Sequence, residues 1–573
     1  MGLDRTIVIG GEAGQGIQTV GQLLAAACHG AGFEVLAVND FESRIRGGHS
    51  SIGLRVADRP VAAPSRRIDL LVALDARSEA VHRPDLAQDG LVLADSAAGL
   101  EEGRALSLAF EQMAKAAGGR ILANTVAAGA CLGLLGAPED HCRDIVRQQF
   151  KAKGDEVVTQ NLAAFSAGYD ATRQATFKGR IRDGWGRSPR GRLMEGNLAV
   201  ALGAVAADCR VGAFYPMSPA TGIMAHLASL SGRYPLVVEQ AEDEIAAANM
   251  VVGASFAGVR AMTATSGGGF CLMTEALGLA AITETPIVVV DAMRPGPATG
   301  LPTRTAQGDL DFVIHASQDD FPRFVFAPAS PEQAFETMIR AFDLSERFQV
   351  PAIVLVDQFF NDSLFTVTDF PPVPEVVRHV VNDADMVDPA AYQRFAVTDT
   401  GVSPRALPCR GKALVVASSD DHREDGHISE TIADRRRMVA KRFAKLPSMA
   451  AAMQPPETFH ADADLLLATW GSSRGAVREA VEALRSEGRS VGAAYFCDLW
   501  PFPVEAAAEL FGNRPFVTVE QNDSGQLGCL VRAQTGLAPA GRITRTDGRP
   551  FFASEIVAGL KEMKGLKGPE GPK

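Results

Sequence analysis

The chain has 573 residues, of which 46% are hydrophobic and 22% are charged, a composition typical of globular proteins with several domains. Its net charge of −12, with no long run of Lys or Arg, argues against a nucleic-acid or anionic-membrane partner. We expect a cytoplasmic protein, because the charged residues Asp4 and Arg5 lie where a signal peptide needs apolar residues and no stretch of 18 apolar residues follows. The eight cysteines include no Cys-x-x-Cys pair, so neither an iron–sulfur cluster nor a zinc site is expected.

The N-terminal region begins with a strand, a glycine-rich turn and a helix over residues 7–31, which is typical of a doubly wound α/β domain. The glycine spacing does not fit a dinucleotide-binding fingerprint, because Ala13 or Thr19 occupies a required glycine position. An anion at the helix N-terminus and a simple tight turn both remain open. A second basic, glycine-containing loop, Arg-Ile-Arg-Gly-Gly-His-Ser, covers residues 44–50.

The rest of this region predicts further elements of the same kind. We expect strands near 70–74 and 91–93 and helices over 125–135 and 142–149. A glycine-rich, basic segment at 178–192 is typical of a linker, with a clamp on a partner subunit as the alternative.

The central region carries several loops that follow predicted strands. The first is Tyr-Pro-Met-Ser-Pro-Ala-Thr at 215–221, where two prolines brace the backbone and present the hydroxyl of Ser218. Thr-Ala-Thr-Ser-Gly-Gly-Gly-Phe at 263–270 lies between a strand and an apolar helix, so that it can hold an anion or let a ring approach the backbone. Arg294 follows a buried strand, at the edge where open α/β sheets bind ligands, and its planar guanidinium suits a carboxylate.

A cluster of acidic residues precedes the least polar helix of the chain. Glu239, Glu242 and Glu244 all suit the first turn of a helix, where acidic side chains are favoured. Glu244 differs because the helix that follows is apolar on all sides and is therefore expected to be buried. A carboxylate at its start is partly removed from water and can share a proton near neutral pH, although a plain N-terminal acid is the alternative.

The C-terminal third predicts a connection followed by another α/β unit. His422 and His427 lie among carboxylates and suggest a metal site or, more in keeping with the sequence, an exposed turn. Residues 465–495 form a βαβ pattern, and a further strand ends at Asn522.

Four motifs of the central region, in this order and spacing, resemble the α subunit of 2-oxoacid:ferredoxin oxidoreductases, which are thiamine-diphosphate enzymes. They are Tyr-Pro-Met-Ser-Pro-Ala-Thr, Glu-Asp-Glu-Ile-Ala-Ala, Thr-Ser-Gly-Gly-Gly and Arg-Pro-Gly-Pro-Ala-Thr-Gly-Leu-Pro-Thr. The two N-terminal glycine loops resemble the γ domain of the same family, fused ahead of the α domain. The resemblance implies several doubly wound α/β domains: 1–175, a γ-type domain near coenzyme A; 176–192, a linker; 193–370, the pyrimidine-binding domain; 371–455, an interdomain connection; and 456–573, a transketolase C-terminal-like domain II.

The resemblance also implies roles for individual residues. Glu244 is the catalytic glutamate that protonates the aminopyrimidine ring of thiamine diphosphate. Ser218 stands where the family usually has threonine, which keeps the hydroxyl donor but loses a methyl contact. The implied cofactor-binding residues are Glu244, Tyr215, Pro216, Thr265, Ser266 and Gly267; the implied substrate-binding residues are Ser218, Arg294 and Thr303; and the candidates near coenzyme A are Gly14, Gln15, Gly16, Arg46, Gly47 and Gly48.

The chain lacks motifs that the whole reaction needs. Gly-Asp occurs at 154–155 and 308–309 without the second glycine of the Gly-Asp-Gly motif that binds Mg²⁺, and no cluster ligands are evident, so no metal site is expected here. The resemblance implies a β subunit that carries Mg²⁺, the diphosphate and a [4Fe–4S] cluster, in an α₂β₂ assembly that reduces ferredoxin. The fused layout favours 2-oxoglutarate over broad-range or pyruvate enzymes. Two alternatives remain: a non-catalytic module that delivers coenzyme A or regulates a partner, and a non-oxidative carboligase.

Overall fold

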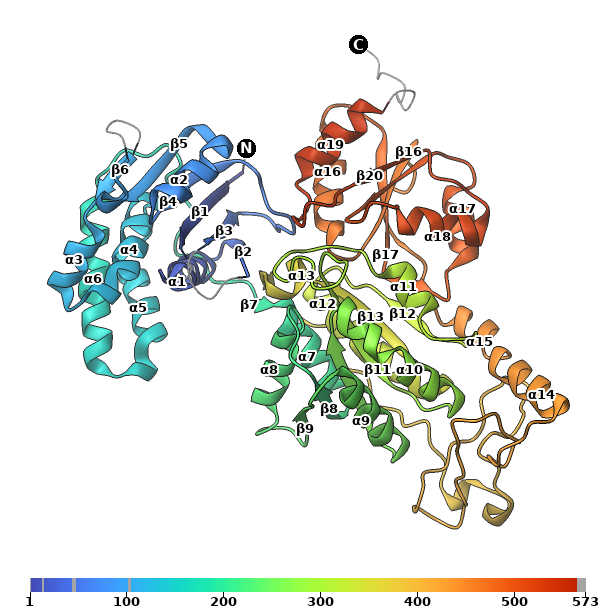
Figure 1. Cartoon of the computed structure of the whole chain (residues 1–573). Coiled ribbons are helices and arrows are strands. Elements are labelled where there is room, and N and C mark those ends of the chain that lie inside the picture. The colour runs from blue at the N-terminus through green and yellow to red at the C-terminus, as the bar shows by residue number, and fades with distance from the viewer. Residues whose placement is uncertain (1, 13–14, 44–47, 101–104, 564–573) are drawn as a thin grey trace. The chain divides into compact units, whose positions relative to one another are not determined.

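The computed structural model describes residues 2–12, 15–43, 48–100 and 105–563 (Figure 1). The chain forms two compact units, and the first comprises Met1–Glu195, Asp362–Asp369 and Phe552–Ser554. The second unit contains the remaining residues. Both units combine parallel strands with helices, so the predicted α/β fold with several doubly wound parts is confirmed.

The first unit is built on an eight-stranded sheet in the order β6-β5-β4-β1-β3-β2-β14-β7. Strands β1, β4, β5 and β6 run parallel, whereas β2 and β3 form an antiparallel hairpin beside β1. Its strands are β1 Asp4–Glu12, β2 Glu34–Phe41, β3 His49–Ala57, β4 Ile68–Ala73, β5 Leu86–Asp95, β6 Ala105–Leu108, β7 Arg192–Glu195 and β14 Leu364–Val367, and its helices are α1 Ile17–Gly30, α2 Ala76–His82, α3 Phe110–Ala117, α4 Ala123–Leu135, α5 Glu139–Phe150 and α6 Asp155–Thr172.

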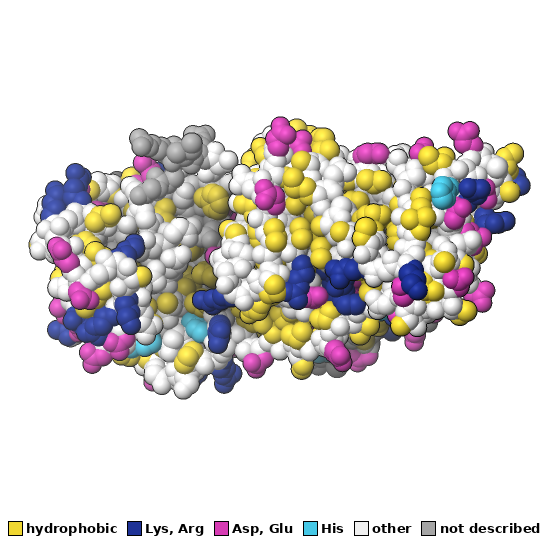
Figure 2. Space-filling model, turned by 90° about the horizontal axis from the view of Figure 1, so that it is seen from below, with side chains coloured by type: hydrophobic (Ala, Val, Ile, Leu, Met, Phe, Trp, Pro, Cys, Tyr) yellow, Lys and Arg dark blue, Asp and Glu magenta, His cyan; other side chains and the backbone are white. Residues whose placement is uncertain are grey.

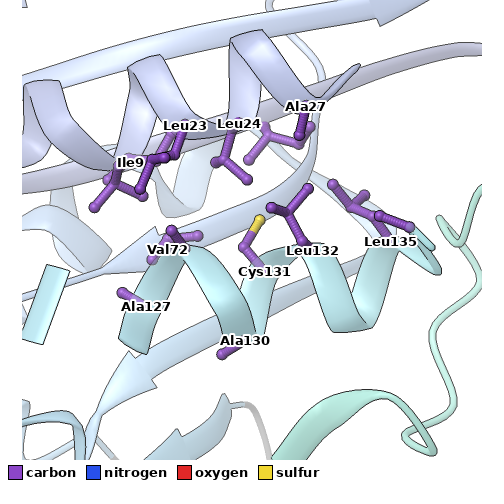
Figure 3. Close-up of a cluster of buried hydrophobic side chains, with 14 of the residues drawn as sticks. Ile9, Leu23, Leu24, Ala27, Val72, Ala127, Ala130, Cys131, Leu132 and Leu135 are labelled. Carbon is purple, nitrogen blue, oxygen red and sulfur yellow. The ribbon is translucent and has the colours of Figure 1, made fainter. Parts of the chain in front are cut away.

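The core of this unit lies where helices α1 and α4 pack on each other and on the sheet (Figure 3). Helix α4 is buried along most of its length, as its nearly continuous apolar sequence requires. Helix α6 packs closely on α4 through Gly129 and Gly168, because a Cβ at either glycine would meet a backbone carbonyl of the other helix. Figure 3 shows the buried side chains Leu23, Leu24 and Ala27 of α1 and Cys131, Leu132 and Leu135 of α4.

Two short strands extend this sheet from beyond the predicted N-terminal domain. Strand β14 pairs with both β2 and β7, so that residues 362–369 belong to the first unit. The Thr366 hydroxyl accepts a hydrogen bond from the Val35 amide at 2.9 Å and lies 3.2 Å from the Val35 carbonyl. The domain boundaries expected from the sequence, at 193 and 370, therefore differ from the limits of the compact units. Strands β7 and β14 have four residues each, and strands this short give almost no periodic signal in a sequence.

The basic segment predicted as a linker is packed against the first unit. The Ile181 amide donates to the Leu135 carbonyl at 2.9 Å, and Ile181 is buried. Trp185 meets the ring of Phe33 edge-on, with 5.2 Å between ring centroids. Residues 178–192 therefore form a loop that packs on the first unit through Ile181 and Trp185.

The second unit contains a seven-stranded sheet in the order β18-β12-β13-β11-β10-β8-β9 and a five-stranded sheet in the order β15-β17-β16-β19-β20. Only the edge strands β18 and β15 run antiparallel to their neighbours. Its strands are β8 Cys209–Phe214, β9 Val237–Gln240, β10 Arg260–Thr265, β11 Val288–Met293, β12 Phe324–Phe326, β13 Ala352–Asp357, β15 Glu457–Phe459, β16 Leu465–Trp470, β17 Val491–Phe496, β18 Asp498–Trp500, β19 Phe516–Glu520 and β20 Gly541–Thr544.

Helices surround both sheets of the second unit, and buried polar contacts join the two sheets. The Gln307 side chain donates to the Trp470 carbonyl at 2.7 Å and accepts from the Gln521 amide at 2.9 Å. The helices are α7 Gly196–Ala206, α8 Thr221–Leu230, α9 Glu244–Phe256, α10 Gly267–Ile282, α11 Leu310–His315, α12 Pro331–Phe348, α13 Gln358–Asp362, α14 Ile432–Phe443, α15 Leu446–Ala451, α16 Arg474–Ser486, α17 Val504–Phe511, α18 Gln526–Thr535 and α19 Ala553–Glu562.

A buried ionic cluster fastens the connection at 371–455 to the seven-stranded sheet. Glu284 is 1% exposed and accepts hydrogen bonds from the ammonium groups of Lys441 at 2.5 Å and Lys445 at 2.7 Å. Burial alone would raise the pKa of Glu284, but Lys445, Lys441 and Arg394 outweigh it and hold that pKa far below its usual range. Burial also lowers the pKa of Lys445 to about 8 in spite of Glu284.

Glu284→Gln is expected to lower the free energy of unfolding of the second unit by about 3–5 kcal/mol, because two buried ammonium groups lose their counter-charge. Since its folded-state pKa is depressed, Glu284 stabilises the protein above the pKa of an unfolded glutamate, and this contribution disappears as the pH falls below that value. Urea unfolding at several pH values measures both effects. The exposed Glu336 is the control, and Glu336→Gln should change stability by less than about 0.5 kcal/mol.

The prediction of an exposed turn holds for His427, which is exposed, but is wrong for His422. His422 is fully buried and stacks on Phe395, with 3.8 Å between ring centroids. Its two ring nitrogens lie 3.0 Å from the Arg423 carbonyl and 3.1 Å from the Ile282 carbonyl. Within the described parts of the chain, no group of three or more His, Cys, Asp and Glu side chains is placed to hold a metal ion.

The surface agrees with the mixed charge pattern of the sequence. On the face shown in Figure 2, Lys and Arg side chains alternate with Asp, Glu and hydrophobic ones. Among the residues described, none of the helices has the length and apolar character needed to cross a lipid bilayer.

Candidate cofactor and substrate site

Three neighbouring parallel strands of the seven-stranded sheet end in the loops that the sequence singles out. Strand β8 leads into residues 215–220, β10 leads into the first turn of α10, and β11 leads into residues 294–303. These strands are adjacent in the order β11-β10-β8 and run in the same direction. Their carboxyl ends therefore bring the loops to one edge of the sheet, which is where open α/β sheets bind ligands.

Glu244 is the buried member of the acidic cluster. It is the first residue of helix α9, and it is only 3% exposed, whereas Glu239 and Glu242 are exposed. The preceding residue, Asp243, caps the helix by accepting a hydrogen bond from the Ala246 amide at 2.7 Å. Glu244 Oε1 is buried without a hydrogen-bond partner among the described residues, so this oxygen is available to a bound group.

Close packing against helix α10 holds the Glu244 carboxylate in place. A Cβ added at Gly269 would lie 2.6 Å from Glu244 Oε1 and would also collide with the Thr265 hydroxyl. Gly269, the third glycine of the Ser-Gly-Gly-Gly turn, is therefore required, because the side chains of Thr265 and Glu244 leave no room for a Cβ. Thr265 Oγ1 also lies 3.8 Å from the Met217 sulfur, which connects the turn to the first loop.

Helix α9 is buried on one face only, which corrects the expectation of a fully buried helix. Ala247, Val251 and Val252 pack into the core, whereas Ile245 and Met250 are 48% and 45% exposed. An apolar sequence on all sides does not by itself require burial within the same chain, because another chain can cover the outer face.

Arg294 joins the loops that follow β8 and β11. Its Nη1 group donates a hydrogen bond to the Ser218 carbonyl at 2.6 Å. The Arg294 side chain is half-buried, and this burial lowers the pKa of its guanidinium. The Leu301 amide closes the arginine loop on the Pro295 carbonyl at 3.0 Å, and Gly300 permits this turn because its φ is +53° and a Cβ there would strike the same carbonyl.

The other predicted residues of this site lie on the same loops with different exposure. Ser218 is exposed and Thr303 is 8% exposed, while Tyr215 is 38% exposed beside Pro216. Ser266 precedes α10, and its hydroxyl is buried without a partner among the described residues. The loops thus combine a buried carboxylate, a guanidinium and the unsatisfied hydroxyl group of Ser266, an arrangement that suits a polar heterocycle and a carboxylate.

The candidates near coenzyme A lie in the first unit. Gly14, Arg46 and Gly47 fall outside the described residues. Gln15 closes its own turn, because its side chain accepts from the Glu12 amide at 2.8 Å.

The backbone conformation explains why two of these positions are glycine. Gly16 has φ of +72° and would meet the Asn124 side chain if it carried a Cβ, and Gly48 has φ of +82° beside Glu42. A role for these residues toward coenzyme A stays a prediction.

Sequence reasoning missed two acidic residues beside the site, Asp291 and Asp309. Asp291 lies in β11 and is fully buried, and Asp309 immediately precedes α11. Asp309 lies close enough to Asp291 to raise the pKa of that carboxyl group, after burial itself. The available signals were an aspartate at the end of an apolar run and the Gly-Asp at 308–309 that lacked a second glycine.

Comparison with known proteins first defines the class. The thiamine-diphosphate-binding domain model of pyruvate flavodoxin/ferredoxin oxidoreductases matches residues 202–441. The pyruvate ferredoxin/flavodoxin oxidoreductase domain matches residues 6–171, and core domain II of pyruvate:ferredoxin oxidoreductase matches residues 463–556. These matches define the class, a subunit of a thiamine-diphosphate-binding oxidoreductase.

Full-length relatives then define the family. The α subunit of 2-oxoacid:ferredoxin oxidoreductase 2 from Aeropyrum pernix is 31% identical, over 98% of this chain and 98% of that protein. The 2-oxoglutarate oxidoreductase subunit KorA of Mycobacterium tuberculosis is 28% identical over 95% of this chain and 89% of that protein. A solved structure of 2-oxoglutarate:ferredoxin oxidoreductase from Magnetococcus marinus, with 2-oxoglutarate, coenzyme A and succinyl-CoA bound, has a TM-score of 0.91 and 32% identity, covering 98% of this chain and 99% of that one. The chain belongs to the 2-oxoacid:ferredoxin oxidoreductase α subunits, and the predicted membership is confirmed.

Proposed function

We propose that the chain is the fused γ–α subunit of a cytoplasmic 2-oxoglutarate:ferredoxin oxidoreductase, which converts 2-oxoglutarate and coenzyme A to succinyl-CoA and CO₂ while reducing ferredoxin. The observation that carries this proposal is the full-length similarity to the Magnetococcus marinus enzyme, whose structure holds 2-oxoglutarate, coenzyme A and succinyl-CoA. The KorA name of the Mycobacterium tuberculosis relative supports the same substrate.

The residues at the sheet edge fit the pyrimidine half of thiamine diphosphate. Glu244 offers a buried carboxylate oxygen that has no hydrogen-bond partner among the described residues. The hydroxyl group of Ser266 is also buried and also has no partner among them. When bound, the cofactor supplies the carbon nucleophile and the electron sink for loss of CO₂. Glu244 would hold a proton at the aminopyrimidine ring, while Tyr215, Pro216, Thr265 and Gly267 would line the ring.

Arg294 and its neighbours fit the carboxylate of a 2-oxoacid. The guanidinium carries five N–H donors in a planar fork, and the hydrogen bond to the Ser218 carbonyl uses only one of its nitrogens. The exposed Ser218, and Thr303 at the end of the arginine loop, would add hydroxyl donors. We assign substrate binding to these three residues.

A β subunit would complete the enzyme. We assign it the cofactor diphosphate, Mg²⁺ and the [4Fe–4S] cluster, and we propose an α₂β₂ assembly with ferredoxin as the electron acceptor. Exposed apolar side chains of the second unit support such a partner, because a partner chain can cover side chains of this kind. They are Tyr215, Val237, Ile245, Met250, Leu272 and Leu301, each between 38% and 60% exposed.

A 2-oxoacid screen of the complex with its β subunit tests the substrate and the role of Arg294. With coenzyme A and a viologen acceptor, 2-oxoglutarate should give a higher kcat/KM than pyruvate or a branched-chain 2-oxoacid. Arg294→Ala should lower kcat/KM about 10- to 100-fold for every substrate, since a hydrogen bond to a charged group contributes about 1.5–3 kcal/mol.

Two further variants separate substrate binding from a purely structural role. Arg294→Lys keeps a donor for the Ser218 carbonyl but loses the planar fork, so a substrate clamp predicts a raised KM. If the lysine variant matched the wild type, Arg294 would only hold the loop. Arg233→Ala, at an exposed position after α8, serves as the control and should leave the kinetics unchanged. A preference for pyruvate would overturn the assigned substrate.

A further inference from the structure

Asp291 and Asp309 form a carboxyl pair at the sheet edge that carries the candidate site. Asp291 lies opposite Thr265 in the parallel register of β10 and β11, so both side chains lie on the same side of the sheet. Asp309 immediately precedes α11, and its carboxyl group lies close enough to act on the Asp291 carboxyl group.

Two carboxyl groups buried this close to each other require a proton. Both oxygens of Asp291 and Oδ2 of Asp309 are buried, and no donor among the described residues reaches any of them. Two ionised carboxylates are acceptors only, so they cannot bond to each other unless one of them is protonated. Two neighbouring negative charges without donors would be unfavourable at this depth.

The groups that face the pair do not supply a counter-charge. Cys271 on α10 lies close enough for both aspartates to raise the pKa of its thiol, after burial itself. Burial and then Asp309 raise the pKa of Asp291 well above its usual range, and burial raises the pKa of Asp309 to about 6. No lysine or arginine within the described ranges is among the groups that act on these two carboxyls.

The other charged groups of the site lie on the neighbouring elements. Glu244 is on α9, Asp311 is on α11, and Arg294, after β11, donates to the Ser218 carbonyl.

The first turn of α10 connects the pair to Glu244. A Cβ at Gly267 would lie 2.5 Å from Asp309 Oδ2, and a Cβ at Gly269 would lie 2.6 Å from Glu244 Oε1. The same turn therefore rests against Asp309 and Glu244. A negative charge on Asp309 is favoured there, because the N-terminus of a helix carries a partial positive charge.

We propose that Asp291 donates a retained proton to Asp309 at neutral pH, and that this acid pair positions the first turn of α10 and, through Gly269, the carboxylate of Glu244. The two aspartates are positioning residues, and their effect on catalysis rests on the function proposed above. Above the pH at which the proton is lost, two buried charges repel each other and the turn shifts.

Infrared spectroscopy of the full-length chain tests the proton directly. At pH 7 the wild type should show the carbonyl band of a protonated carboxyl group, and Asp291→Asn should lack it. The spectrum of the wild type minus that of the variant cancels other buried acids, such as Asp357 and Glu520, whose pKa values burial also raises. An unchanged spectrum would overturn the proposal, whether or not the complex proves active.

Activity of the complex with its β subunit tests the positioning role. Asp291→Asn keeps a donor that cannot titrate, whereas Asp291→Leu has a similar size and no donor. The asparagine variant should be about tenfold or more active than the leucine variant, the range expected for one buried hydrogen bond, and should lose less activity than the wild type at alkaline pH. Equal activity of the two variants, or an unchanged alkaline limb in Asp291→Asn, would contradict positioning by the pair. The surface variant Asp320→Asn is the control and should follow the wild-type pH profile.

Discussion

Glu244→Gln is expected to lower kcat of the complex by at least about two decades while thiamine diphosphate still binds, because a positioned proton-transfer group contributes about 10²- to 10⁴-fold. Glutamine keeps the length of the side chain that packs against Gly269 but cannot donate a carboxyl proton. Steady-state assays with 2-oxoglutarate measure turnover, and isothermal titration measures cofactor affinity.

The exposed glutamates of the same cluster provide matched controls. Glu239 and Glu242 are exposed, so Glu239→Gln and Glu242→Gln should retain close to wild-type turnover. Retention of more than half of the wild-type activity in Glu244→Gln would remove this residue from the proton-transfer role. A similar loss in all three variants would point to the charge of the cluster instead.

The sequence predicted elements with strong periodicity and missed elements whose pairing is distant. Helix α4 and strand β1 are long and apolar, and both lie where the periodicity placed them. Strands β7 and β14 have four residues each, and β14 finds its partner β2 more than 300 residues away in the chain. No pattern in the sequence near β14 could reveal that pairing, because the partner strand comes next to β14 only when the sheet has formed.

The candidate site could be predicted where one residue stands out from an apolar background. Glu244 stood out because a carboxylate precedes a helix without other charges, and the structure shows that it is buried. The catalytic and binding roles of Glu244, Ser218, Arg294 and Thr303 stay predictions. The contacts of Gly269 with Glu244 and Thr265 depend on how α9 packs on α10, which spacing along the chain does not reveal.

Asp291 and Asp309 could not be predicted as a pair from sequence motifs. Asp309 attracted attention only as part of a Gly-Asp without the second glycine of a metal-binding motif. Its partner Asp291 lies 18 residues earlier, and the two meet because a strand and a loop of one sheet edge converge. The sequence does not show that the two aspartates come together, because their contact is a property of the fold.

The largest expected effect concerns the partner subunit. The sequence contains neither Gly-Asp-Gly nor a Cys-x-x-Cys pair, so we assign the metal–diphosphate and cluster sites to a β subunit. The outward faces of α9 and α10 carry the exposed apolar residues Ile245, Met250 and Leu272, which a partner would cover. We expect all activity to depend on that partner.

The full-length chain purified alone should therefore be colourless and inactive, and anaerobic addition of its β subunit should restore visible cluster absorbance and coenzyme A-dependent reduction of ferredoxin by a 2-oxoacid. Ile245→Lys with Met250→Lys would place two charges on the proposed contact face and should weaken assembly, because unpaired charges are unfavourable in a buried interface. Val387→Lys, at an exposed apolar position on the connection, is the matched control and should assemble normally. Size-exclusion chromatography, iron content and viologen reduction measure the outcome. Catalysis of ferredoxin reduction by the isolated chain would show that the division of labour between the subunits is wrong.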